Sequence, residues 1–279
     1  MGRRNSGGLF FYNRQASHPW YIFNRKSSDK YWRLRMFSTI PDKRSIAFPG
    51  DRSLGELYTS DENGRAELLG EATGVVEVPA GRQLALYYSF DPAFGLAPLA
   101  RLAADDLQCI SFLGSDIRDS ELSAISGLTG LREIDLSCTA VGNGGVKFLS
   151  SLRHLVKLNL SSTRITDQGL SSIAALDSLE ELVLDDTRVG DEGAALISGL
   201  SLKVLSMSFT SITNKGLKSI KEMKSLERLR LNCTRIDDAG LSHVARLRAL
   251  KELWVRSTDV SYPGLVELTK WLSDCEIIR

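Results

Sequence analysis

The C-terminal two thirds of the chain consists of seven consecutive copies of one pattern, which confines the fold to a repeat architecture. The copies open at Leu107, Leu131, Leu155, Leu179, Leu202, Leu226 and Leu250. Five of the six intervals are 24 residues long and one is 23. Positions one, four and six of every copy are apolar, and this alternation is typical of a short strand with one buried face. Because the strand recurs in the same place, the pattern predicts a parallel sheet.

The remainder of each copy predicts a turn and a short helix. Position nine is Ser115 in the first copy and Thr in the other six, and we interpret these hydroxyls as a ladder that bonds the backbone of the neighbouring turn. Pairs such as Thr166-Asp167 offer N-cap oxygens just before an apolar pattern of helical period. Position fifteen is Gly in six copies, from Gly145 to Gly264, where the missing side chain would let a helix approach its neighbour or the chain turn tightly.

These columns resemble leucine-rich repeats of the 24-residue form L-x-x-L-x-L-x-x-T-x-I-T-D-x-G-L-x-x-L, similar to the ribonuclease-inhibitor-like and cysteine-containing groups. The resemblance covers residues 107–279. It departs from those groups in two ways: Thr stands where they usually carry Asn or Cys, and Glu121 replaces Gly in the first copy. The resemblance implies an α/β solenoid, with a parallel sheet on the concave face and short helices on the convex face. It also implies a non-catalytic scaffold for protein partners.

Residues 45–106 precede the repeats and carry short β-like runs separated by turn signals such as Pro49-Gly50 and Asn63-Gly64. We expect a small antiparallel β module over residues 45–90 that covers the open edge of the solenoid sheet; the alternative is a module with a ligand of its own. Residues 91–106 are expected to form a connecting turn and a short helix. Apolar residues from about 271 onward suggest a C-terminal cap, and the alternative is an array that continues.

Residues 1–44 form an N-terminal arm with ten Lys or Arg, two acids and nine aromatic residues. The candidate binding residues in the arm are Trp20, Tyr21, Arg25, Lys26, Trp32, Arg33 and Arg35. Basic and aromatic side chains together suit docking onto a partner or onto the body of the chain, and they also suit RNA binding by phosphate contact and base stacking. A transit peptide and an N-myristoylation signal at Gly2 are further alternatives.

No enzyme motif is present, so we expect no catalytic residues, no cofactor and no metal. The histidines have no fixed relation to a Cys or a carboxylate. Strand spacing puts Cys138 and Cys233 about 19 Å apart, so we expect free thiols. The sequence carries no secretory signal and no apolar run long enough to span a membrane, which makes the cytoplasm the expected location and an organelle the alternative.

The outward strand positions of a solenoid form a continuous wall, and such walls bind partners. The middle of this wall is predicted to be acidic, and its C-terminal half gathers Arg with aromatic residues. The candidate partner-binding residues are Glu181, Asp185, Asp186, Phe209, Arg228, Arg230, Trp254 and Arg256. Trp and Arg dominate interface hot spots, so the sequence predicts a scaffold, an adaptor or a subunit of a larger assembly. Two alternatives are a receptor of a ubiquitin-type ligase, which residues 45–90 do not favour because they carry no F-box-like helical segment, and an RNA-associated protein. A further alternative is that these side chains are simply exposed to solvent and bind no partner.

Overall fold

The computed structural model describes residues 43–61 and 64–279. The arm candidates Trp20, Tyr21, Arg25, Lys26, Trp32, Arg33 and Arg35 therefore lie outside the described residues. The strands are β1 Lys43–Ala47, β2 Gly55–Ser60, β3 Ala66–Glu71, β4 Val75–Pro79, β5 Gln83–Tyr88, β6 Cys109–Ser111, β7 Glu133–Asp135, β8 Lys157–Asn159, β9 Glu181–Val183, β10 Val204–Ser206, β11 Arg228–Arg230, β12 Glu252–Trp254 and β13 Glu276–Ile278. The helices are α2 Asn143–Val146, α3 Asp167–Ile173, α4 Asp191–Ile197, α5 Asn214–Ile220, α6 Asp238–Val244 and α7 Tyr262–Thr269, with 3-10 helices η1 Ala97–Arg101, η2 Asp119–Ile125 and η3 Lys147–Ser151.

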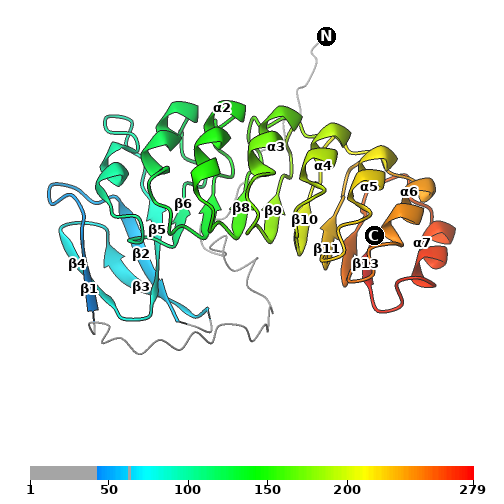
Figure 1. Cartoon of the computed structure of the whole chain (residues 1–279), viewed down its shortest axis with the longest axis horizontal. Helices are drawn as coiled ribbons and strands as arrows, with labels where there is room; N and C mark the ends of the chain where they lie inside the picture. Colours follow the sequence, from blue (N-terminus) through cyan, green and yellow to red (C-terminus); the bar gives the residue numbers. More distant parts are fainter. Residues whose placement is uncertain (1–42, 62–63) are drawn as a thin grey trace, which may run out of the picture. The chain divides into compact units, whose positions relative to one another are not determined.

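One sheet contains a strand from every repeat, as the sequence predicts. Strands β6 to β13 pair in parallel and in order, and each pairs with the same register as the one before it. The helices form a second row on the other side of each repeat (Figure 1). Leucines, isoleucines and valines at positions one, four, six and eleven fill the space between the two rows and are almost completely buried.

The β module extends this sheet by main-chain hydrogen bonding. Strand β5 runs parallel to β6, with Leu86 opposite Ile110. On its other side β5 pairs with β2 in antiparallel fashion, and β2 pairs with β3, so that the sheet continues through the module. Strands β1 and β4 form a separate antiparallel pair that adds Ile46 and Val78 to the same core. The edge of the repeat sheet is thus paired rather than merely covered, which the sequence did not indicate.

A carboxylate or amide at position thirteen joins each repeat to the next. Asp191 Oδ1 accepts a hydrogen bond from the backbone N–H of Thr213 (2.8 Å) and another from that of Gly216 (2.9 Å). The same position-thirteen oxygen receives the position-twelve N–H of the following repeat at every joint from Asp119 to Asp238. A Cβ on Gly216 would stand 2.7 Å from Asp191 Oδ1. The Gly column is therefore needed because it leaves room for this inter-repeat contact.

The hydroxyl column does a different job from the one predicted. Thr163 Oγ1 donates to the carbonyl of Leu160 (2.6 Å), three residues earlier in its own repeat, and the other five threonines of the column do the same. The prediction that these hydroxyls bond the neighbouring turn is wrong. They close the tight turn after each strand, where the position-six carbonyl would otherwise lack a partner inside the protein.

In the first repeat, a side chain of the same repeat accepts the position-twelve N–H that a preceding repeat would otherwise accept. No repeat precedes Arg118, and its backbone N–H donates to Glu121 Oε2 (2.8 Å) in the same 3-10 helix. Glu121 occupies the position that is Gly elsewhere, and its carboxylate lies against Gly95. The last repeat carries Tyr262 at position thirteen, so the series of position-thirteen acceptors ends at Asp238. Both departures from the repeat pattern occur at its ends.

Among the described residues, no helix is both long enough and apolar enough to cross a bilayer.

Candidate binding face of the sheet

The outer face of the sheet displays positions three and five of each repeat, and its middle is less exposed than the sequence suggests. Glu181 is only 7% exposed, and its neighbours Val183, Val204 and Ser206 are also buried. Burial raises the pKa of Glu181, while Lys157 and Arg228 oppose that shift. The prediction that Glu181 belongs to an exposed acidic wall is therefore wrong. A sequence does not readily show this burial, because short strands that are buried on both faces differ from strands that are buried on one face by only one or two apolar residues.

Asp185 and Asp186 follow β9 and have different surroundings. Asp185 Oδ1 accepts hydrogen bonds from Ser206 Oγ (2.6 Å) and from the backbone N–H of Ser208 (2.7 Å). Burial raises the pKa of Asp185, and these hydrogen bonds lower it in part. Asp186 is exposed and accepts from Ser162 Oγ (2.9 Å). Asp185 thus holds two repeats together, and Asp186 is the exposed acid of the predicted pair.

Three of the predicted residues form a cluster at the C-terminal end of the face. Arg230 on β11 lies opposite Trp254 on β12 in the sheet register. The guanidinium carbon of Arg230 lies 5.5 Å from the centroid of the Trp254 ring, and that of Arg256 lies 5.7 Å from it. Both distances are within the range of cation–π attraction. We refer to Arg230, Trp254 and Arg256 as the Arg-Trp-Arg cluster.

The cluster has hydrogen-bond donors that nothing in the described part of the chain satisfies. The indole Nε1 of Trp254 is buried and has no acceptor among the described residues. Neither Arg230 nor Arg256 forms an ion pair with any described carboxylate. An unsatisfied buried donor costs about 1 to 3 kcal/mol and calls for an explanation. The guanidinium donors of Arg230 and Arg256 are not fully buried, so a partner can supply acceptors to them.

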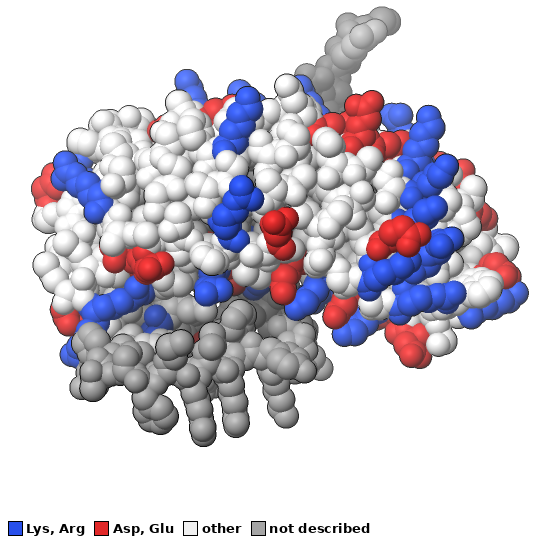
Figure 2. Space-filling model, viewed as in Figure 1, with Lys and Arg blue, Asp and Glu red and all other residues white. Residues whose placement is uncertain are grey.

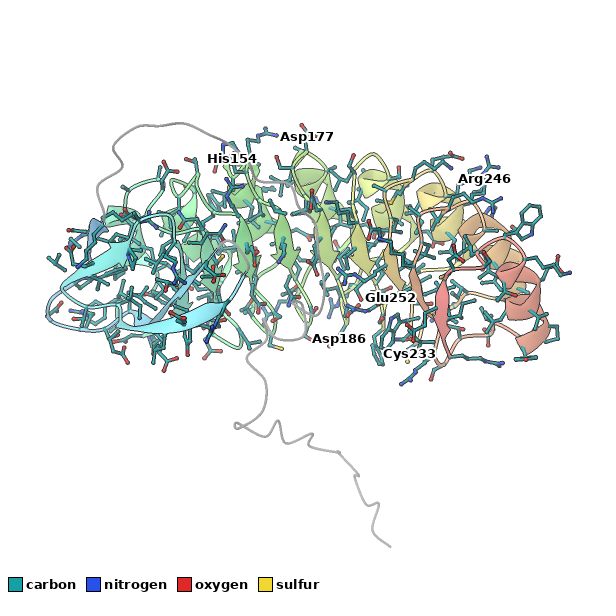
Figure 3. The ribbon with its side chains drawn as sticks, turned by 90° about the horizontal axis from the view of Figure 1, so that it is seen from below. His154, Asp177, Asp186, Cys233, Arg246 and Glu252 are labelled. Atoms are coloured by element: carbon teal, nitrogen blue, oxygen red, sulfur yellow. The ribbon has the colours of Figure 1, made fainter. Side chains whose placement is uncertain are left out.

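Arg228 stands apart from the cluster. It is paired in the sheet register with Glu252, and it also lowers the pKa of Glu181 two strands away. Arg230 also lowers the pKa of Glu181, so these two arginines share that acidic neighbour. Figure 3 shows Glu252 on its strand, with Asp186 and Cys233 along one edge of the strand row and His154, Asp177 and Arg246 along the opposite edge. The structure brings Arg230 and Arg256 together around the Trp254 ring, and Arg228 is not part of that contact.

Phe209 lies at position eight, directly after β10, where every repeat adopts the left-handed conformation. Its φ is +58°, and Cys138, Ser162, Asp186, Cys233 and Ser257 have similar values. Phe209 is the bulkiest side chain of this column, and it is 61% exposed. Only glycine adopts this conformation freely, so a large exposed aromatic residue here has no benefit for folding. Sequence periodicity marks the column but not its backbone conformation.

Basic and acidic residues are unevenly distributed along the repeats. Residues 107–201 contain seven Lys or Arg and thirteen acids, whereas residues 202–279 contain fourteen Lys or Arg and nine acids. Figure 2 shows Lys and Arg side chains gathered over the later repeats, toward the right of that view. The Arg-Trp-Arg cluster therefore lies in the basic half of the solenoid.

Besides the cluster, the described residues contain free thiols and an open pocket. All four cysteines are free, and no group of three or more His, Cys, Asp or Glu residues is arranged to hold a metal ion within the described ranges. An open pocket at the first repeats is lined by the loop after β5, including Phe90, and by Arg118 and Arg164. The sequence did not single out this pocket, because its lining comes from loops that are distant in the chain.

Comparison with known proteins supports the repeat architecture. A family model described as "Leucine Rich repeat" matches residues 128–150, 151–174, 177–198, 200–221 and 222–245. The fold is similar to that of internalin C2 from Listeria monocytogenes, with a TM-score of 0.54 and 24% identity over 70% of this chain and 80% of that chain. It is also similar to another Listeria monocytogenes internalin (inlF), with a TM-score of 0.50 and 17% identity over 69% of this chain and 58% of that one. No curated protein matches the sequence significantly.

Proposed function

The chain is a leucine-rich-repeat protein, and we propose that it is a non-catalytic scaffold whose strand face binds a protein partner at its C-terminal end. Leucine-rich-repeat proteins are generally protein-interaction scaffolds. The observation that carries the proposal is the Arg-Trp-Arg cluster, in which a half-buried indole lacks an acceptor and two flanking guanidiniums lack a carboxylate. Trp and Arg are the side chains that most often dominate binding free energy at interfaces.

Phe209 extends the binding surface that we propose beyond the sheet. Its ring is 61% exposed on the turn after β10, one strand before Arg230. An aromatic ring offers a large contact area at low cost in side-chain entropy, because only two torsions must be fixed. We assign Phe209 to the rim of the partner site and the Arg-Trp-Arg cluster to its centre.

Photo-crosslinking can place the partner on one face of the solenoid. p-Benzoylphenylalanine is introduced at Phe209 in one variant and at Phe148, in the 3-10 helix η3 of the second repeat, in a second variant. Phe148 is also exposed, at 37%, and it belongs to a 3-10 helix rather than to a strand of the sheet. We expect crosslinked partner only from position 209, with a yield that falls when Trp254 is replaced by Ala. Crosslinks from position 148 alone would contradict the proposed face.

A role as a receptor of a ubiquitin-type ligase has less support than the scaffold function. The described residues before the repeats form strands β1 to β5 and the five-residue 3-10 helix η1, and none of them forms a longer helical segment for recruitment. An RNA-binding role for residues 1–44 is a separate proposal. It predicts RNA binding that weakens steeply with salt and disappears when the arm is deleted.

A further inference from the structure

The Arg-Trp-Arg cluster presents donors and no acceptors. Arg carries five N–H donors and the indole of Trp carries one, and neither side chain can accept a hydrogen bond. Within the described residues, the Trp254 Nε1 has no acceptor, and no ion pair engages Arg230 or Arg256. A partner that fits this cluster must therefore bring acceptors. Carboxylates satisfy the donors and the two positive charges together.

Acidic residues around the cluster limit the extent of its positively charged surface. Glu252 lies on the same strand as Trp254, Asp185 is close enough to Arg230 for that arginine to lower its pKa, and Glu181 lies farther along the sheet. The positive surface thus covers little more than strands β11 and β12, which lie about 5 Å apart. Within that surface Trp254 is the single aromatic ring on the strands.

This arrangement favours a protein segment over a nucleic acid. A single-stranded nucleic acid places a phosphate at every nucleotide, and its binding grooves are positive along the whole track and carry several stacking rings. On this face a nucleic acid strand that left the cluster toward β9 would meet Asp185 and the exposed Asp186. A short acidic segment needs only the two arginines.

We propose that the Arg-Trp-Arg cluster binds an acidic protein segment, with carboxylates on Arg230 and Arg256 and an apolar side chain between Trp254 and Phe209. This inference rests on the proposed scaffold function and adds the chemical class of its partner. The division of charge between the early and late repeats supports it, because an acidic segment is repelled by the first half of the solenoid and attracted by the second.

Two labelled peptides test the charge preference. One places three glutamates on each side of a phenylalanine, the other replaces the glutamates with lysines, and fluorescence anisotropy is measured against the full-length protein. We expect the glutamate peptide to bind more tightly than the lysine peptide, and to weaken as salt is raised because charge interactions are screened. Equal binding of the two peptides, or no binding of the glutamate peptide, would overturn the inference.

Variants locate the binding, because residues 1–42 contribute eight Lys or Arg of their own. Replacing both Arg230 and Arg256 with Gln removes the charges and retains polar side chains of similar length. We expect the affinity for the glutamate peptide to fall by about tenfold or more. The matched control is Arg188→Gln, an exposed arginine on a repeat turn, which should bind like the parent protein. A glutamate affinity that is unchanged in the double variant would refute the assignment to this cluster.

Two outcomes separate this inference from the proposed function. If crosslinking from position 209 captures a partner and the double Gln variant captures it equally well, the scaffold function stands and the acidic class is wrong. If an oligouridylate of seven nucleotides binds the parent protein more tightly than the glutamate peptide, and loses that advantage in the double variant, the cluster is a nucleic-acid site instead.

Discussion

Asp191 and Gly216 belong to successive repeats, and the carboxylate oxygen of Asp191 lies 2.7 Å from the point that a Cβ on Gly216 would occupy. The same oxygen accepts the backbone N–H of Gly216. A side chain at this glycine would thus collide with the group that bonds its own backbone. The close approach of a position-thirteen oxygen to the glycine of the next repeat recurs at every joint from Gly145 to Gly264.

Gly216→Ala should destabilise the protein although alanine favours helices. In an exposed helix this change would gain about 1 kcal/mol, but here the new methyl group must displace Asp191, and we expect a net loss of about 1 to 3 kcal/mol in urea unfolding. Gly199→Ala is the control, because nothing lies within 4 Å of its added Cβ. The double variant Asp191→Ala/Gly216→Ala should lose less than the sum of the single changes. Simple additivity would contradict the proposed coupling.

Phe209→Gly should stabilise the fold and weaken partner binding. The left-handed backbone at φ +58° destabilises a bulky residue by about 1 to 2 kcal/mol, and glycine removes part of this cost. We therefore expect the free energy of unfolding to increase by about 0.5 to 1 kcal/mol. Cys138→Gly, at φ +56°, should gain a similar amount without affecting the partner. Denaturant titration gives the stability and photo-crosslinking from another position of the face gives the binding. A clear loss of stability in Phe209→Gly would show that its ring packs against the body.

The free energy of unfolding of the Asp135→Asn variant, relative to that of the parent protein, should increase as the pH rises. Burial raises the pKa of Asp135 above its ordinary value of 3.8, partly offset by hydrogen bonds from Ser137. The folded state therefore holds this proton more tightly than the unfolded chain, and the resulting stability is complete below pH 3.8 and is lost as the pH rises through the raised pKa. An amide does not titrate, and it fits this place: Asn159 Oδ1 accepts from the Ser161 backbone and hydroxyl just as Asp135 Oδ1 accepts from those of Ser137.

Urea unfolding of the parent protein and of Asp135→Asn at a series of pH values, from about 4 to about 7, checks this sign. The unfolding free energy of the variant relative to the parent should increase across that range. The exposed Asp177→Asn serves as the control. A difference that shrinks toward neutral pH would mean that the charged form of Asp135 is the stabilised one.

The cysteines should react with iodoacetamide in order of exposure. Cys138 is exposed, whereas Cys109 on β6 is 8% exposed and burial raises its pKa, which leaves little of the reactive thiolate. Burial also raises the pKa of Cys275 to about 11. We expect Cys138 to be alkylated first and Cys109 last, as followed by mass spectrometry. Early alkylation of Cys109 would indicate that the pairing between β5 and β6 opens in solution.

The sequence predicted the elements that depend on periodicity. Columns of apolar residues placed the strands and the core, and the Gly column indicated that something approaches the helices closely, which the structure identifies as the position-thirteen oxygens. The hydroxyl column was visible, but periodicity cannot tell which carbonyl each hydroxyl bonds. Thr163 bonds its own repeat, and the joint falls to Asn143 and its equivalents.

Periodicity also predicted part of the binding face that we propose. Alternation places Arg230 and Trp254 on one side of the sheet, and the repeat period places them on adjacent strands. Which charges act on one another depends on neighbours one or two strands away, so the sequence could not show that Arg228 and Arg230 both lower the pKa of Glu181. Burial of Glu181 depends on the side chains around it in three dimensions, and no local pattern reports that.

Because every joint uses the same pair of groups, the solenoid has no intrinsic length. A further copy inserted between two repeats would bring one donor at position twelve and one acceptor at position thirteen, and would leave every existing bond with an equivalent partner. Duplication of a 24-residue segment would therefore lengthen the sheet by about 4.8 Å while the Arg-Trp-Arg cluster kept its internal spacing. The hydrogen bonds that hold neighbouring repeats together therefore also allow the solenoid to lengthen or shorten by whole repeats.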